Sequence, residues 1–152
     1  MQVFRIAKAR YIADLSGAGA RLNGGRWNHK GISIVYASSS RALATVEYLV
    51  HVPAAIIPRN LEIAAIEIPD DIVPDRVETA DLPENWRRYP PPTELADVGS
   101  DWALSNQSLL LEVPSVVVEN EFNALMNPAH PDMRNVHIVD MQPYVFDERL
   151  IR

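Results

Sequence analysis

Residues 24–51, GGRWNHKGISIVYASSSRALATVEYLVH, bring three side chains with chemical potential into one short piece of chain. Arg26 carries a planar fork of donors that suits a pyrophosphate. Tyr36 offers a flat ring and a hydroxyl, and Glu47 offers a carboxylate that can stabilise a developing positive charge. The glycines at 24 and 25 could leave backbone N–H groups available beside Arg26. We therefore treat this stretch as the candidate site.

Each of these residues also has an ordinary structural explanation. Arg26 could be a surface arginine in a flexible loop, and Tyr36 could be a core tyrosine at a strand end. Periodicity alone places Glu47 more readily on the solvated face of an amphipathic helix than in a site. Trp27 could stack on a ligand or form a wall of the loop, and we favour the wall.

Three residues outside this stretch are further candidates. Ser115 follows a proline between two apolar runs, where its hydroxyl could reach a ribose or a carboxylate. Asn123 suits a role in fixing loop backbone, with substrate binding as its second possibility. Arg5 lies in a predicted strand, where it either forms an ion pair at the strand end or joins Arg26 at a phosphate.

The histidines and the lack of cysteine argue against a metal centre. Histidine occurs at positions 29, 51, 130 and 137, without the H-E-x-x-H or i, i+4 spacing of a helical metal site. Without cysteine, thiolate ligands and disulfides are excluded. A serine hydrolase built on Ser115, His130 or His137 and Asp140 is a minor alternative, because no G-x-S-x-G motif surrounds the serine. We expect chemistry without a metal.

Length and charge limit the class of protein. A chain of 152 residues with 47% hydrophobic and 22% charged residues is expected to form one globular domain over residues 1–152. Its net charge of −6 does not suit a nucleic-acid binder, which needs clustered lysine and arginine. Residues 1–15 lack the pattern of a signal peptide, and no stretch is long and apolar enough for a membrane span. We expect a cytoplasmic protein.

Strand patterns outnumber helix patterns along the chain. Runs rich in β-branched and aromatic residues predict strands at 2–6, 32–36, 61–68, 109–113 and 116–118, and two more within 135–146. Helical spacing follows the serines at 38–40 and recurs at 94–107, with an interruption expected at Gly99, and 121–127 suggests a helical turn. Residues 16–25 and the proline-rich segment 69–93 are expected to be loops. The result is an α+β fold, a mixed, strand-rich sheet core with inserted helices.

Five segments, in order, resemble the RES-domain toxin family. They are GGRWN at 24–28, YAS at 36–38, ALATVEYLVH at 42–51, VPS at 113–115 and NALMNPAHP at 123–131. The likeness runs from FRI at 4–6 to DERL at 147–150, and so covers nearly the whole chain. The family is named for an arginine, a glutamate and a serine, which match Arg26, Glu47 and Ser115. The resemblance implies a core similar to the fold of ADP-ribosyltransferase toxins.

The resemblance also implies an activity. Members are toxins of bacterial type II toxin–antitoxin pairs that consume NAD, which is then a substrate and not a cofactor. Glu47 would stabilise the positive charge that builds as nicotinamide leaves, and Arg26 would grip the pyrophosphate. Tyr36 would stack on nicotinamide or ribose, and Ser115 would bond to the ribose or the carboxylate. The acceptor of ADP-ribose stays open between water, phosphate and a protein side chain, and a non-catalytic nucleotide-binding module is the alternative.

The same resemblance implies a protein partner. We expect a helix-turn-helix antitoxin of the Xre type to plug the cleft at Arg26, while any toxin homodimer in the complex uses another surface. The segment 69–93 contains Trp86 and Tyr89, which could anchor an interface or pack over the toxin's own core.

Overall fold

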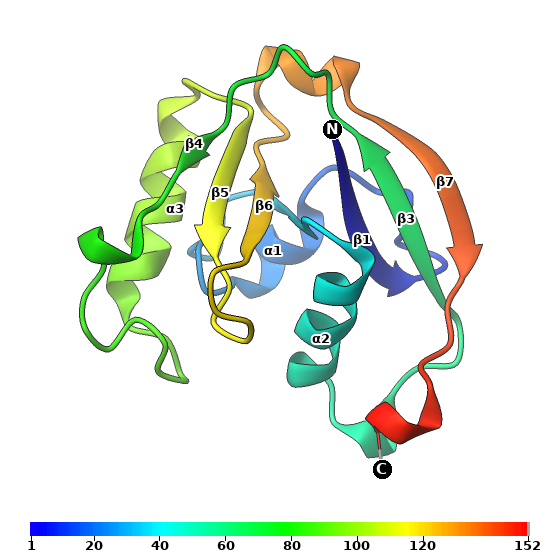
Figure 1. Cartoon of the computed structure of the whole chain (residues 1–152). Helices are drawn as coiled ribbons and strands as arrows, with labels where there is room; N and C mark the ends of the chain where they lie inside the picture. Colours follow the sequence, from blue (N-terminus) through cyan, green and yellow to red (C-terminus); the bar gives the residue numbers. More distant parts are fainter. Residues whose placement is uncertain (152) are drawn as a thin grey trace.

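A seven-stranded sheet forms the centre of the computed structural model, which describes residues 1–151 (Figure 1). The predicted domain also includes residue 152, which lies outside the described part. The strand order is β4-β5-β6-β2-β1-β3-β7, and all neighbours are antiparallel except the parallel pair β4–β5. The strands are Gln2–Lys8 (β1), Val35–Ser38 (β2), Leu61–Glu67 (β3), Asp75–Arg76 (β4), Leu110–Pro114 (β5), Phe122–Met126 (β6) and His137–Pro143 (β7).

The sheet consists of two parts that meet at β1 and β2. β1 pairs with β3 along its whole length, whereas β1 and β2 share the single pair Phe4↔Ser38. Figure 1 shows β5 and β6 on one side of the molecule and β1, β3 and β7 on the other. Any group carried at the end of β2 therefore lies where the two parts diverge.

Within residues 1–151, three helices and three short 3-10 turns connect the strands, and a fourth 3-10 turn follows the last strand. The helices are Ala18–Asn23 (α1), Arg41–His51 (α2) and Thr93–Ser105 (α3). The 3-10 turns are Ala54–Ile56 (η1), Thr79–Asp81 (η2), Pro131–Asn135 (η3) and Glu148–Leu150 (η4). The helix predicted after the serines is confirmed, and Ser40 caps α2 by accepting a hydrogen bond from the Leu43 amide at 3.0 Å. No helix within residues 1–151 has the length and apolar character needed to cross a membrane.

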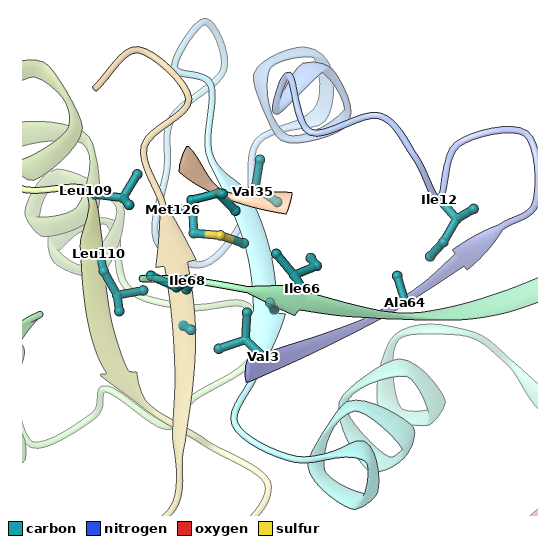
Figure 2. Packing of buried hydrophobic residues seen from close by; sticks show 12 residues of the cluster. Val3, Ile12, Val35, Ala64, Ile66, Ile68, Leu109, Leu110 and Met126 are labelled. Carbon is teal, nitrogen blue, oxygen red and sulfur yellow. The ribbon is translucent and has the colours of Figure 1, made fainter. Parts of the chain in front are cut away.

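Alternation of side chains along the strands gives the sheet two buried faces. One face holds a cluster that includes Val3, Ile66, Leu110 and Met126 (Figure 2). The opposite face packs under α3, where strand residues, helix residues and the loop before β2 form a second cluster of Trp27, Ile34, Leu95, Trp102, Ala103, Leu111, Val113 and Leu125. The α+β class predicted from the sequence is confirmed.

The helix at 93–105 runs without the interruption predicted at Gly99. Gly99 is buried, and a Cβ added there would lie 1.8 Å from the carbonyl oxygen of Trp27. The glycine is therefore a contact point between α3 and the loop that carries Arg26, and it does not end the helix.

Other local predictions were wrong for reasons of tertiary structure. Residues 122–126 form β6, because they pair with β2 and β5, where a helical turn was predicted. Residues 116–118 form a bend where a strand was predicted, and within the described residues the end of the chain supplies one strand, β7 (His137–Pro143), where two were predicted within 135–146. Part of the glycine-rich segment 16–25 folds as α1. The strand predicted at 32–36 begins only at Val35.

Candidate functional site

Helix α2 presents Glu47 to the junction between the two parts of the sheet. Leu43 is fully buried one turn earlier, so Glu47 lies on the helix face that packs inward, and it is half-buried. The C-terminal segment holds this helix from outside. The Thr45 hydroxyl bonds to that of Tyr144, and Tyr48 stacks on Phe146 with ring centroids 5.6 Å apart. The solvated-face explanation of Glu47 is therefore wrong.

Two side chains donate hydrogen bonds to the same oxygen of Glu47. Ser115 Oγ lies 2.6 Å from Glu47 Oε1, and Asn123 Nδ2 lies 2.7 Å from it. Within residues 1–151, the hydrogen bonds to this carboxylate all reach Oε1. Oε2 is thus left to accept a hydrogen bond from a ligand while the first oxygen holds the group in place.

Ser115 has a fixed orientation because its own oxygen accepts two backbone hydrogen bonds. The amides of Val117 and Val118 each donate to Ser115 Oγ at 3.1 Å, and the serine is only 2% exposed. With its lone pairs occupied in this way, the hydroxyl proton is directed to Glu47. No histidine accepts that proton, which removes the geometric basis for a serine hydrolase at Ser115.

Asn123 is oriented by a residue that the sequence analysis did not assign to the site. Ser38 and Asn123 are directly opposite each other in the β2–β6 pair, and Ser38 Oγ donates to Asn123 Oδ1 at 2.8 Å. This bond identifies Oδ1 as the acceptor and so turns Nδ2 toward Glu47. Ser38 was visible in the sequence only as a serine before a helix, because its role depends on strand register.

Tyr36 holds the loop that precedes it. Its hydroxyl donates to Asn28 Oδ1 at 2.6 Å and accepts from the Trp27 amide at 3.2 Å. Asn28 is buried and ties the loop further by donating to the carbonyls of Ala20, His29 and Ile32. Burial raises the pKa of Tyr36 well above its usual value, so the hydroxyl stays protonated at neutral pH. Asn28 is a second site-supporting residue that sequence reasoning missed.

Arg26 is held by the segment that follows η2. Its Nη1 donates to the carbonyl oxygens of Trp86 at 2.9 Å and of Arg88 at 3.2 Å. Burial lowers the pKa of Arg26, and the negative charge of nearby Glu47 opposes that change. Arg26 and Glu47 therefore belong to one electrostatic site, although they come from a loop and a helix.

The glycines before Arg26 do not supply free amides. The Gly24 N–H donates to the Ala20 carbonyl at 2.8 Å, and the Gly25 N–H donates to the Asn28 carbonyl at 3.0 Å. The prediction of available backbone donors was wrong. Gly25 has a different use, because a Cβ there would lie 2.9 Å from both Asn28 Oδ1 and the Tyr36 hydroxyl.

Arg5 and Trp27 are placed by the structure in supporting roles. Arg5 lies on the same face of β1 as Val3, opposite to Phe4, and its Nη1 donates to the carbonyls of Ile12 and Asp14 at 3.2 and 2.7 Å. It therefore fastens the turn after β1 and is not paired with Arg26. Trp27 is only 3% exposed within the core under α3, so its ring is a wall and leaves no face for a ligand.

In the part of the chain that the structure describes, cavities lie on both sides of the candidate site. One of about 410 Å³ lies beside Ser115, between the turn after β5 and the segment that contains Trp86 and Arg87. The other, of about 300 Å³, is called the Arg26 pocket here, and its lining is Asn23, Gly24, Gly25, Arg26, His51, Tyr89 and Pro91. Within residues 1–151 there is no group of three or more histidine, aspartate or glutamate side chains arranged to hold a metal ion.

Comparison with known proteins connects this geometry to one family. The family model described as the RES domain matches residues 2–147. A protein of Sphingobium sp. (strain YBL2) named "Prs ADP-ribosylating toxin" is 45% identical over 141 residues, covering 91% of this chain and 88% of that protein. "Toxin Res" of Yersinia enterocolitica is 40% identical over 153 residues, covering 99% of both chains.

The fold also has a counterpart among solved structures. A chain in the crystal structure of the M. tuberculosis MbcT-MbcA toxin-antitoxin complex superposes with a TM-score of 0.71. The match covers 94% of this chain and 83% of that chain at 18% identity. At this identity the likeness establishes a shared fold.

Proposed function

Because this chain belongs to the RES-domain family, we propose that it is a toxin that cleaves the nicotinamide–ribose bond of NAD. The observation that carries the proposal is the Glu47 carboxylate, which Ser115 and Asn123 hold through Oε1 alone. In this position, the carboxylate can accept a hydrogen bond from a ribose hydroxyl on Oε2 and stabilise a positive charge beside it.

The chemistry needs only one such carboxylate. Nicotinamide is bonded to the ribose as a cationic pyridinium, and it leaves with the bonding electron pair as a neutral base. No general acid has to protonate it, unlike the leaving oxygen of an ordinary glycoside. The positive charge passes to the ribose ring as an oxocarbenium ion, and Glu47 stabilises that ion until an acceptor attacks the anomeric carbon.

Arg26 and Tyr36 serve this reaction from the glycine-rich loop. Arg26 binds the pyrophosphate, with one end of its guanidinium already oriented by the Trp86 and Arg88 carbonyls. Tyr36 fastens the same loop through Asn28, and its half-buried ring forms the wall beside the ribose and nicotinamide.

Transfer of ADP-ribose to a protein is the second candidate function. The Sphingobium relative, 45% identical, is named for ADP-ribosylation and not for NAD hydrolysis. Both functions share the cleavage step at Glu47 and differ only in what attacks the anomeric carbon. Water, phosphate and a protein side chain are the acceptors to distinguish.

A protein partner completes the proposal. The structural neighbour was crystallised as a toxin-antitoxin complex. We propose that this chain pairs with an antitoxin of the Xre helix-turn-helix type in the cytoplasm. The antitoxin is expected to occlude Arg26 and Glu47, and any contact between two copies of this chain lies on another surface.

The experiment is incubation of the purified chain with NAD, followed by chromatography of the products. Release of free nicotinamide is the expected result. The second product then identifies the acceptor. Attack by water gives ADP-ribose, attack by phosphate gives ADP-ribose phosphate, and a protein acceptor increases in mass by one ADP-ribosyl group. An intact NAD pool after prolonged incubation, with and without phosphate and cell extract, would refute the proposal.

A further inference from the structure

The Arg26 pocket differs in charge from the rest of the molecule. The chain carries a net charge of −6, yet none of the residues that line this pocket within 1–151 is acidic, and three of them, Asn23, Arg26 and His51, can offer side-chain N–H donors to an anion. Its volume of about 300 Å³ is at the lower end of the range for ligand sites, roughly 300–1,000 Å³. It therefore suits one polar portion of a ligand and not a whole dinucleotide.

His51 reaches the pocket from the same helix as the catalytic carboxylate. It is the last residue of α2 and follows Glu47 by one turn, so the two side chains lie on one face, with Cβ atoms about 5–6 Å apart. Side chains of a helix point toward its N-terminus, which directs His51 over the turn that carries Glu47. A ligand whose anomeric carbon lies at Glu47 would thus have its next chemical group beside His51.

Arg26 lines the pocket, and part of its guanidinium makes no hydrogen bond to the protein within residues 1–151. Within residues 1–151, both hydrogen bonds of its guanidinium to the protein are made by Nη1, toward the Trp86 and Arg88 carbonyls. Nε and Nη2 are left for an anion. The segment that supplies these carbonyls also places Tyr89 and Pro91 on the pocket wall, and Tyr89 is 82% exposed.

We propose that His51 is a substrate-binding residue that completes a diphosphate subsite with Arg26. The proposal rests on the function proposed above, in which Arg26 binds the diphosphate, and extends it by adding His51 to the residues that hold this group. In NAD, the diphosphate is attached to the 5′ carbon of the ribose whose anomeric carbon reacts. One turn of α2 then reaches from the reacting ribose to the diphosphate, with Glu47 beside the ribose and His51 beside the diphosphate.

The first test is steady-state kinetics with NAD for His51→Ala and His51→Gln. Loss of one hydrogen bond to a charged group should raise KM by about tenfold in His51→Ala, while kcat stays within about twofold. Glutamine keeps an N–H donor, so the KM of His51→Gln should lie between those of His51→Ala and the wild type. His137→Ala is the matched control, because His137 is exposed at the start of β7 in the other part of the sheet. An unchanged KM in His51→Ala, or a loss of kcat alone, would overturn the proposal.

A binding measurement separates this proposal from the proposed function. Calorimetry with ADP and with adenosine compares ligands that differ only in the diphosphate. We expect the wild type to bind ADP more tightly than adenosine, and His51→Ala to lose about tenfold toward ADP alone. That result would support the subsite even if NAD were not cleaved. Equal ADP affinity in the two proteins, equal affinity for the two ligands, or no ADP binding by the wild type would refute it, even if nicotinamide were released.

Discussion

At the scale of single residues, the site is defined by the asymmetry of one carboxylate. Ser115 and Asn123 both donate to Glu47 Oε1, and each donor is itself oriented, Ser115 by two backbone amides and Asn123 by Ser38. A group that is held in this way does not need to reorganise when charge develops beside it. The position of the Glu47 carboxylate therefore depends on the side chains that surround it.

Asn123→Ala tests this dependence. The carboxylate would keep its bond to Ser115 and lose the other, so kcat for nicotinamide release should fall on the order of tenfold with little change in KM. Ser38→Ala should cause a smaller loss in the same direction, because the Asn123 amide would remain but would no longer be oriented. Full kcat in both variants would show that Glu47 does not need this support.

Tyr36→Phe is predicted to act on stability. The change removes the hydroxyl that bonds to Asn28, and it leaves a buried carbonyl oxygen without its donor, which costs about 1–3 kcal/mol. Urea unfolding of both proteins measures this difference. A free energy of unfolding equal to that of the wild type would mean that Tyr36 does not fasten the loop.

The raised pKa of Tyr36 gives a pH dependence with a defined sign. The unfolded tyrosine ionises near pH 10, whereas the folded one keeps its proton to higher pH, so the unfolded state binds fewer protons above pH 10. Stability contributed by the neutral hydroxyl is therefore complete below pH 10 and is lost as the pH rises beyond it. Denaturant unfolding between pH 8 and about pH 11 should show a shallower decline for Tyr36→Phe than for the wild type. Parallel declines would contradict the assignment.

At the scale of elements, contacts between helices and loops determine where the site residues lie. α3 approaches the loop that carries Arg26 so closely that only glycine fits at position 99. Gly99→Ala should force α3 and Trp27 apart and cost about 1–3 kcal/mol of unfolding free energy, with a lower affinity for NAD. Gly19→Ala is the matched control, because a Cβ in α1 at that position meets nothing within 4 Å and alanine favours the helix. Equal thermal stability of the two variants would refute the close contact.

The elements predicted correctly from the sequence are those with a strong local signal. α2 has a serine cap and helical spacing, and β3 is a long apolar run, so both were predicted close to their bounds. β6 contains alanine, leucine and methionine, which favour helix locally, and only pairing with β2 and β5 makes it a strand. The three valines at 116–118 look like a strand, but the amides of Val117 and Val118 are used to orient Ser115.

The same distinction applies to the site. The structure brings together Glu47, Ser115 and Asn123, and the charge of Glu47 acts on Arg26. Asn123 was expected first to fix loop backbone, whereas its amide donates to the Glu47 carboxylate. The supporting residues Ser38 and Asn28 could not be predicted. Ser38 matters because the register of β2 and β6 sets it opposite Asn123, and Asn28 matters because its buried amide reaches three carbonyls. Such relations exist only after the chain has folded.

At the scale of the whole molecule, the site lies where the two parts of the sheet meet, and this has a consequence for inhibition. The single pair Phe4↔Ser38 joins β1 to β2, and α2 begins at Arg41, shortly after β2 ends at Ser38. An antitoxin that covers this junction would block Arg26 and Glu47 together.

NAD turnover measured against antitoxin concentration at several NAD concentrations should then show inhibition that excess NAD relieves. Undiminished NAD binding to the purified complex would place the antitoxin elsewhere.

The rate of nicotinamide release by wild type and Glu47→Gln, measured side by side on NAD, tests the central claim most directly. Glutamine keeps the shape of the side chain and an oxygen that can accept from Ser115 and Asn123, but it removes the negative charge. We predict that release falls by about a hundredfold or more, while NAD affinity and thermal stability change little. Release by Glu47→Gln at a rate near that of the wild type would contradict the account.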